Sequence, residues 1–521
     1  MSLTETKTIE VDVEALERAT QAAKAAAAKK AKGYPLTPVV NPTVSRFLEQ
    51  KETLFSLVSA LGSPLNILFP DLIEKNVEGF TGTFKKLSLL GKVFFAHKCN
   101  SSDSLVRRLA LTDANLDVSS AGELRHALGS GFDSSRIEAT GPKNTEFIGL
   151  AVQQGVTIAV DSISELKKIV EMRPKLKLKK PTKILLRLSG FEATHSKFLN
   201  KGSRFGVPIK EVGEAFDILE ANRKEINLLG FSFHLDTVSV LERAIAIENC
   251  LELFEEALSR DFEPRVLDIG GGYKVNYLQN EDEWNAYVSA LKEAVLGTHP
   301  SMTWHGNAFG MSSDKGKLKG NFNSYSYFDT QTGGDFLDEL LSQKFGNLGD
   351  ATAATILRDN MIELWIEPGR SLVEQCGITV GRVNSVRSSS RGEPIVCLNM
   401  KRQDISFLDQ EIFVDPIIVS MKDSSAKQID KKDDDKKENK ETIGVFFAGN
   451  LCLESDLIYR HLTYLDKLPE EGDLVIFVNT AGYFMDFSAT TSIMHPIAQK
   501  VAVVERDGKL NWTMDDQYVP F

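Results

Sequence analysis

Lys98 is a residue of this sequence whose type and position suggest covalent chemistry. It stands two residues after the apolar run 92–96, in the segment FFAHKCN. If that run is a buried strand, its end partly desolvates the ε-amino group and disfavours the charged form. The neutral amine is the nucleophile of Schiff-base chemistry. Since a lysine after a strand is more often solvated, this interpretation depends on the residues that lie beside it.

Gly270, Gly271 and Gly272 form a second feature, because three consecutive glycines let backbone N–H groups approach a ligand closely. Arg370 follows in the segment EPGR, and its guanidinium adds a fork of donors that suits phosphate. A glycine triplet alone is a weak signal, since many are only tight turns. Together the two segments favour a bound phosphate group.

Regular elements must bring these residues together. Between residues 90 and 370, short β-branched or aromatic runs alternate with stretches able to form helices, which is typical of parallel βα units. We therefore expect an α/β fold, a closed (β/α)8 TIM-like barrel, whose site residues follow the carboxyl ends of its strands. The run 64–69 is one strand too many and is assigned to a different sheet. The barrel strands are expected at 92–96, 114–118, 136–140, 156–160, 183–188, 230–234, 265–269 and 362–366.

In such a barrel, Lys98, the glycines and Glu367 meet at one mouth, and the loops after the last two strands are the usual phosphate position. An imine-forming lysine, a phosphate cradle and an isolated carboxylate are what pyridoxal 5′-phosphate requires. The sequence therefore predicts this cofactor and a small-molecule substrate.

The rhythm changes after Arg370, where strands follow one another with short connections. This predicts a mostly antiparallel β domain that the run 64–69 completes. We expect the long segment 273–361 to cap the substrate and the mixed-charge loop 422–441 to be solvated. The predicted division is a flexible Ala/Lys-rich lead (1–45), an N-terminal segment (46–90), the barrel (91–372) and the β domain (373–521).

Composition excludes several classes of protein. Hydrophobic residues make up 42% of the 521 residues, enough for a substantial core, and no apolar run approaches the roughly 18 residues that a membrane span needs. A formal charge of −11 disfavours nucleic acid and anionic lipid surfaces as partners. The five cysteines never form a CxxC pair, which predicts reduced thiols, a cytoplasmic location and no metal site.

Ten motifs, in this order, resemble those of the fold type III pyridoxal-phosphate decarboxylases, the group of diaminopimelate and ornithine decarboxylases. The resemblance spans 60–500 and implies an amino-acid decarboxylase built from a barrel and a β domain. The motifs are AHKCN, DVSSAGEL, TGPKN, VDSISEL, SRFG, FSFHLDT, LDIGGG, IEPGRSLV, GNLCLESD and AGYF.

The resemblance also implies residue roles. Lys98 would hold the cofactor, His234 would stack on its ring, and Glu367 would pair with the ring nitrogen so that the ring accepts the electrons released by CO2 loss. Tyr483 stands one place before the usual tyrosine of the family. The implied cofactor-binding residues are Lys98, Asp117, Arg187, His234, Thr237, Gly270, Gly271, Gly272, Glu367, Arg370 and Tyr483.

Cys452 matches the cysteine that re-protonates the α-carbon from the neighbouring subunit, which implies a homodimer with a shared active site. With Lys98, Glu367 and His234 it completes the expected catalytic set. The substrate-binding residues are expected near this cysteine, at Arg402, Glu454 and Asp456.

The sequence departs from the family near Cys452. Ornithine and diaminopimelate decarboxylases place an acid directly after this cysteine, where Leu453 stands here, and no aspartate occurs at 398–400. Lys401 and Arg402 follow instead. These departures predict a substrate with a bulkier or anionic distal group rather than simple ornithine or lysine.

Two alternatives remain open at this stage. One is a racemase or epimerase on the same cofactor and barrel, and the other is a catalytically inactive regulatory relative. Racemases of this fold tend to place an arginine at the ring nitrogen, so Glu367 and Cys452 favour decarboxylation.

Overall fold

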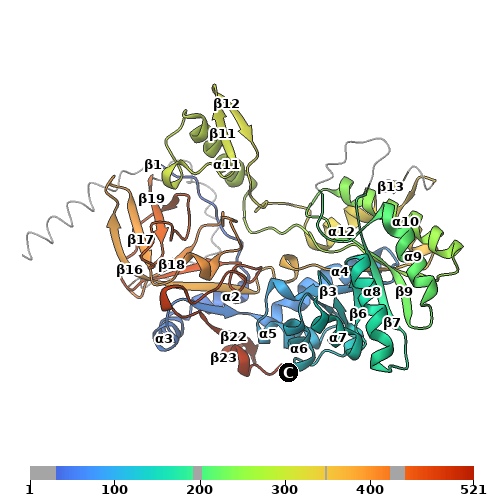
Figure 1. Cartoon of the computed structure of the whole chain (residues 1–521). Coiled ribbons are helices and arrows are strands. Elements are labelled where there is room, and N and C mark those ends of the chain that lie inside the picture. The colour runs from blue at the N-terminus through green and yellow to red at the C-terminus, as the bar shows by residue number, and fades with distance from the viewer. Residues whose placement is uncertain (1–30, 192–201, 346–348, 423–440, 521) are drawn as a thin grey trace, which may run out of the picture.

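The computed structural model describes residues 31–191, 202–345, 349–422 and 441–520, which form two bodies joined side by side (Figure 1). A barrel carries the middle of the chain, and a β domain combines its N-terminal and C-terminal parts. Among the helices of the described residues, none has the length and apolar character needed to cross a bilayer.

Eight parallel strands close the barrel, as the sequence predicts, because β6 pairs with β7 and completes the ring. β9 begins four residues before the expected strand, since Ile226 already pairs with Thr182 of β7. In ring order the strands are β3 (Gly91–Ala96), β4 (Asn115–Val118), β5 (Ile137–Ala139), β6 (Thr157–Val160), β7 (Thr182–Ser189), β9 (Ile226–Ser232), β10 (Val266–Asp268) and β15 (Glu363–Ile366).

Strand alternation arranges the lumen in layers. Phe94, Leu185, Val266 and Trp365 pack together as a small apolar cluster of their own. A side chain two residues further along a strand points to the same face of the sheet. Arg187, Asp268 and Glu367 stand two residues after Leu185, Val266 and Trp365, so they form the next layer of the lumen. The barrel therefore has an apolar plug below a layer of charged groups at its carboxyl end.

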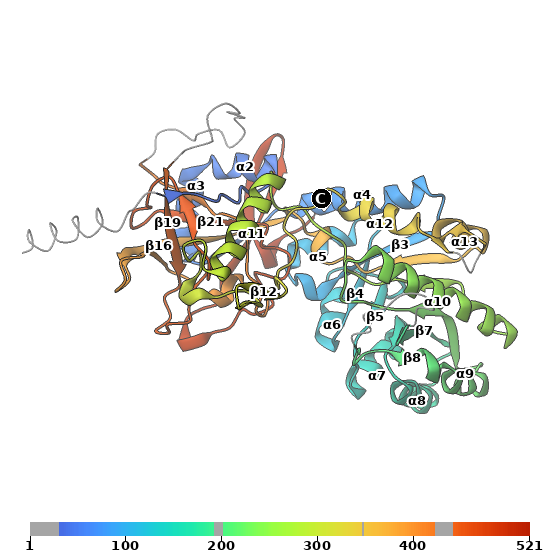
Figure 2. The same cartoon turned by 90° about the horizontal axis from the view of Figure 1, so that it is seen from above.

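Helices surround this ring on the outside (Figure 2). Their apolar faces and the outward faces of the strands form one continuous core. The helices are α4 (Ile73–Lys86), α5 (Asp103–Ala110), α6 (Ala121–Gly129), α7 (Thr145–Gln154), α8 (Ile163–Met172), α9 (Val212–Ala221), α10 (Val240–Ser259), α12 (Gly333–Leu341) and α13 (Ala353–Asp359).

The β domain is mostly antiparallel, and its central strand β16 pairs with β2, β17 and β21. β2 lies in the N-terminal run 64–69, which the sequence predicts to lie outside the eight-stranded barrel. Its pairing with β16 and β22 confirms that it belongs to this second sheet. The strands are β1 (Ala31–Lys32), β2 (Leu65–Leu68), β16 (Gly377–Ser388), β17 (Pro394–Leu398), β18 (Ile417–Val419), β19 (Glu441–Ala448), β20 (Thr463–Leu465), β21 (Leu474–Val478), β22 (Gln499–Arg506) and β23 (Lys509–Met514).

The expected flexible lead 1–45 is wrong from residue 31 onward. Leu36 is buried, and its N–H donates to the carboxylate of Asp415 at 2.8 Å. The N–H of Val39 donates to the carbonyl of Tyr277 at 2.8 Å, so this segment is fastened to the β domain. Helices α2 (Pro42–Leu48) and α3 (Lys51–Leu61) follow it directly. Residues 1–30 and most of the charged loop, 423–440, lie outside the described residues.

The segment 273–361 divides between the two bodies. Its first part, with α11 (Glu281–Leu296), β11 (Met311–Asp314) and β12 (Lys317–Gly320), packs on the β domain (Figure 1). Its second part returns to the barrel as α12 and α13. No described residue of the segment lines the cavity at the barrel mouth, so the described part of the segment does not cap the pocket of its own chain.

Candidate active site

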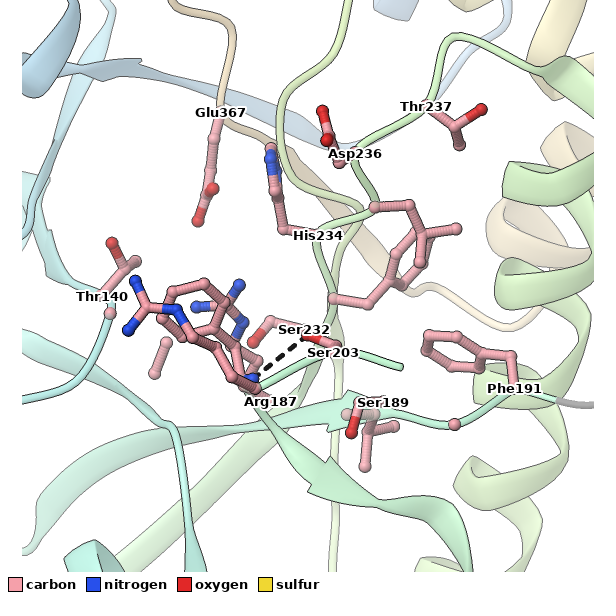
Figure 3. A pocket seen from close by; sticks show the side chains of 18 of the residues that line it. Thr140, Arg187, Ser189, Phe191, Ser203, Ser232, His234, Asp236, Thr237 and Glu367 are labelled. Carbon is pink, nitrogen blue, oxygen red and sulfur yellow. Dashed lines mark hydrogen bonds between the residues drawn. The ribbon is translucent and has the colours of Figure 1, made fainter. Parts of the chain in front are cut away.

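A cavity of about 850 Å³ opens at the carboxyl end of the barrel strands. Among the residues predicted from sequence, it is lined by Lys98, Arg187, His234, Thr237 and Glu367. Figure 3 shows the side chains of Glu367, His234 and Arg187 arranged around the same hollow. The barrel thus brings together residues that lie far apart in the chain.

Lys98 lies in a short helical turn, His97–Cys99, directly after β3. The flanking residues His97 and Cys99 are buried, which fixes the turn, but Lys98 itself is exposed to the cavity. The expectation that burial desolvates this lysine is therefore wrong for the free chain. Its amine is instead open to a small molecule that enters the mouth.

Four carboxyl groups crowd the inner wall beside this lysine. Asp117 is buried at the end of β4, where burial raises its pKa and the positive charge of Lys98 opposes that rise. Ligand oxygens of Glu138, Asp268 and Glu367 all lie within 4.8 Å of one another. Burial, and next the Asp268 carboxyl, raises the pKa of Glu367 well above its ordinary value. Burial likewise raises the pKa of Asp268 to about 6.

His234 is held as a neutral ring at the cavity edge. Burial, followed by the charge of Lys98, lowers its pKa well below the ordinary value of a histidine. Its Nδ1 accepts the N–H of Gly271 at 3.1 Å, which fixes the orientation of the ring. A Cβ at Gly271 would lie 2.6 Å from the carbonyl oxygen of Glu367, so only glycine permits this approach.

Of the three glycines expected in the cofactor site, two use their amides within the chain. Gly270 donates its N–H to the carboxylate of Asp268 at 2.8 Å, and Gly271 donates to His234. Arg243, to which the sequence assigned no role, donates to the carbonyls of Gly271 and Gly272. Two of the glycines therefore serve packing, and the N–H of Gly272 has no acceptor among the described residues.

Thr237 stands where a phosphate would still find donors. It lines the cavity with Ser239, which caps the N-terminus of the long helix α10. The partial positive charge and free N–H groups of a helix N-terminus favour an anion. The start of α10 and the N–H of Gly272 therefore offer donors that suit an anion.

Arg370 does not line the cavity. Its guanidinium packs on the rings of Tyr325 and Tyr483, and Nη2 donates to Gln410 at 3.0 Å. Its Nη1 is buried and has no acceptor among the described residues. An anionic group would satisfy this donor, because a buried charged donor is costly to leave unpaired.

The residues expected around Cys452 lie on the β domain and do not line the cavity of the same chain. The carboxylate of Asp456 accepts the N–H groups of Leu451 and Arg402, each at 2.8 Å. The guanidinium of Arg402 donates to backbone carbonyls and to a carboxylate, so its donors are already engaged. Asp456 and Arg402 therefore hold the loop rather than a substrate, while Cys452 and Glu454 are exposed.

Sequence reasoning missed a chain of hydrogen bonds behind Lys98. Nε2 of His97 lies 2.7 Å from Nδ1 of His126, whose Nε2 lies 2.6 Å from the carboxylate of Asp103. On its other side, Nδ1 of His97 lies 3.6 Å from a carboxylate oxygen of Glu123. Glu123 in turn accepts the N–H of Ser119 on the cavity wall at 2.5 Å. His97 lies in the motif AHKCN and Glu123 in DVSSAGEL, but neither motif reveals that three elements bring them together with His126 and Asp103.

The site fits the cofactor that the resemblance implies. Lys98 offers an accessible amine, Glu367 a buried carboxyl that can face a ring nitrogen, and His234 a flat neutral ring. The start of α10 suits a phosphate in this cavity, whereas the unpaired donor of Arg370 lies outside the cavity lining. All of these groups suit pyridoxal phosphate chemistry.

Comparisons with known proteins agree with this geometry. Residues 72–305 match the family described as pyridoxal-dependent decarboxylase, pyridoxal binding domain. An uncharacterized protein of Sinorhizobium fredii is 27% identical and covers 93% of this chain and 97% of its own length. Diaminopimelate decarboxylase of Bacillus methanolicus is 26% identical, with 82% of this chain and 86% of the relative covered.

Solved structures share the fold. The arginine decarboxylase of Paramecium bursaria Chlorella virus has a TM-score of 0.59 at 20% identity and covers 88% of this chain and 100% of its own. The lysine/ornithine decarboxylase of Vibrio vulnificus has a TM-score of 0.59 at 20% identity, with 89% and 99% covered. In sequence and in fold the chain is therefore similar to the fold type III pyridoxal-phosphate-dependent amino-acid decarboxylases, and pyridoxal 5′-phosphate is its cofactor.

Proposed function

We propose that the protein removes the α-carboxylate of an amino acid whose distal group is bulkier than that of ornithine or lysine. The observation that carries this proposal is the convergence of Lys98, His234 and Glu367 on one cavity of about 850 Å³. The bound cofactor supplies a ring that accepts the electron pair of the broken carbon–carboxylate bond.

The residues of the chain divide the remaining work. Lys98 binds the cofactor, His234 supports the face of its ring, and Glu367 holds a proton at the ring nitrogen. Replacement of the carboxylate by hydrogen consumes one proton for each CO2 released. In this proposal Cys452 of a neighbouring subunit delivers that proton to the α-carbon.

Exposed apolar side chains on the β domain support a homodimer. Leu453 is 53% exposed, Phe487 is 47% exposed and Met494 is 95% exposed. Contacts within the chain hold two of these segments, since the rings of Phe407 and Phe487 meet edge to face at 4.7 Å and Lys401 donates to the Pro496 carbonyl. Such a gathering of apolar groups is typical of a surface that another protein covers.

The basic residues near Cys452 do not favour an anionic substrate. Arg402 is engaged as described above, and the ammonium of Lys401 lies 2.7 Å from the carboxylate of Asp404. Leu453, which replaces an acid of the family, offers an apolar contact instead. Of the two distal groups predicted from sequence, the bulkier one therefore has the better support.

A CO2-release assay over a panel of amino acids tests this proposal. Panel members would carry aromatic, amide, branched, anionic and simple ammonium distal groups, with meso-diaminopimelate, arginine, ornithine and lysine as family controls. We expect a bulky member to have a kcat/KM at least about 100-fold above ornithine, a difference of about 2.7 kcal/mol in transition-state binding. Turnover of ornithine or lysine near 10⁵ M⁻¹s⁻¹, on the order of a dedicated enzyme, contradicts the substrate proposal.

The same assay separates decarboxylation from racemisation. A racemase exchanges the α-hydrogen with solvent without releasing CO2, whereas a decarboxylase releases both CO2 and an amine. The carboxyl of Glu367 at the ring-nitrogen position favours the second outcome, because it supports electron withdrawal by the ring. We also propose a cytoplasmic location, since all five cysteines are free thiols.

A further inference from the structure

Glu138 lies inside the barrel, on β5, where the apolar neighbours of the strand give no reason for a charge. Its side chain is fully buried, and neither carboxylate oxygen has a hydrogen-bond donor among the described residues. The second oxygen of Asp268 is also buried and without a donor. These oxygens can satisfy one another only if at least one carboxyl carries a proton, because a carboxylate has no donor of its own.

The charges around Glu138 favour such proton sharing. Glu138, Asp268, Glu367 and Asp117 are four acids in one buried layer. Arg187 is already paired with Asp161 at 3.2 Å, which leaves Lys98 as the main balancing cation. The ionisable groups that face this space are Lys98 after β3, Asp117 on β4, Asp161 after β6, Arg187 on β7, His234 after β9, Asp268 on β10 and Glu367 after β15.

The cluster is also tied to the glycine turn. Asp268 accepts the N–H of Gly270 at 2.8 Å, and Gly270 accepts the N–H of Glu367 at 3.0 Å. Asp268 and Glu367 are thus connected through the main chain, while Glu138 reaches both carboxyl groups from the opposite wall of the lumen. A shift of the Glu138 side chain would be felt at Glu367.

We propose that Glu138 is a positioning residue for Glu367, and that proton sharing among Glu138, Asp268 and Glu367 holds the Glu367 carboxyl toward the ring-nitrogen site. This inference deepens the proposed function, because it explains how one acid at that site is kept in place. Burial, followed by the Asp268 carboxyl, raises the pKa of Glu138 well above its ordinary value, which agrees with a shared proton.

The first test uses the cofactor-free protein. A carboxyl that keeps its proton in the folded chain and loses it in the unfolded chain makes stability fall as pH rises above the unfolded value of about 4.5. Glu138→Gln preserves the shape and removes this loss. We expect the thermal midpoint of the variant, relative to wild type, to rise steadily between about pH 5 and 8. A constant difference over that range overturns the proposal.

The second test uses the cofactor-loaded protein. We expect Glu138→Gln to shift the pH midpoint of the visible absorbance of the bound cofactor, and Glu138→Leu to weaken cofactor affinity about tenfold, since no hydrogen bond remains. Unchanged absorbance and affinity overturn the proposal. If Glu138→Leu does not fold, Glu138→Gln still decides the question.

Glu374→Gln is the matched control. Glu374 is a partly buried acid outside this cluster, accepts the N–H of Asn276, and has its pKa raised to about 7 by desolvation. Its replacement should also stabilise the chain at high pH but leave the absorbance of the cofactor unchanged. An equal absorbance shift in both variants contradicts a specific role for Glu138. The cofactor-free test is independent of the substrate, so it stands even if no decarboxylation is found.

Discussion

The barrel mouth and the loop 449–456 of the β domain use polar residues in opposite ways. At the mouth, Glu138 and Asp268 have buried oxygens without donors, and Lys98 stands open to the cavity. In the loop, Asp456 accepts two backbone N–H groups, and its own carbonyl accepts a third from Gly449. The buried acids of the barrel lack donors from the main chain, whereas Asp456 of the loop is supplied with them.

This difference indicates how the work is divided. The mouth can bind and orient a cofactor with residues of a single chain. The loop presents Cys452 and Leu453 to solvent, and neither lines the cavity of its own chain. A rigid loop that exposes a thiol and an apolar side chain suits the completion of a site in another copy. The following experiments test or sharpen this comparison, from the largest expected effect to the smallest.

Removing the amine at the mouth should have the largest effect. We expect Lys98→Ala to lower kcat on the order of 10⁴-fold, or about 5.5 kcal/mol, because no other described residue of the mouth offers an amine. Lys92→Ala is a suitable control, since Lys92 pairs with Glu363 at the opposite end of β3. Activity measurements on both variants check this expectation, and an active Lys98→Ala enzyme contradicts it.

Mixing two inactive variants tests whether the loop acts on another copy. Lys98→Ala and Cys452→Ala homodimers should each be inactive, but random exchange gives mixed dimers with one intact site. We expect about a quarter of the wild-type activity to return after the two are unfolded and refolded together. If activity stays at the level of the separate variants, the two residues do not meet across a dimer.

Glu367→Gln should lower activity without disrupting the cavity. The amide keeps the shape of the side chain but cannot share a proton with the ring nitrogen, so we expect kcat to fall about 10²-fold. Cofactor content measured on the purified variant separates lost binding from lost chemistry. An unchanged kcat would remove Glu367 from the proposed mechanism.

His97→Gln should have the smallest effect, and mainly on stability. Although burial opposes it, the contact with His97 at 3.6 Å and the N–H of Ser119 lower the pKa of Glu123 below its ordinary value of 4.5. Stability from this group is present above pH 4.5 and is lost as pH falls through the lower folded value. We expect the free energy of unfolding to fall by about 1–2 kcal/mol at pH 7, and by less at acidic pH. Denaturant unfolding at several pH values measures it, and a loss independent of pH would contradict the link to Glu123.

The barrel could be predicted because its strands are short apolar runs between helical stretches, a pattern that survives without tertiary information. The segment after residue 31 could not, since Leu36 and Val39 lie in a proline-containing stretch without periodicity and are fixed by distant partners. The residues at the cavity mouth could also be predicted, because they follow the carboxyl ends of the barrel strands. Lys98, His234 and Glu367 stand where parallel strands converge, so their meeting is a consequence of topology.

Hydrogen-bond partners were beyond the sequence. Nothing in the GGG triplet reveals that two of its N–H groups donate to Asp268 and His234. The sequence also does not show that the guanidinium of Arg402 donates to backbone carbonyls. Glu138 was missed for a related reason. A single acid in a short strand reads as a solvent-facing residue, and only the closed barrel shows that it points inward.

Peptide mapping after borohydride reduction of the cofactor-loaded protein tests the central claim most directly, because reduction fixes the cofactor covalently to its lysine. We expect the cofactor mass on the peptide that contains Lys98, with loss of the visible absorbance. A label on another lysine, or a purified protein that takes up no pyridoxal phosphate and remains colourless, would contradict the account.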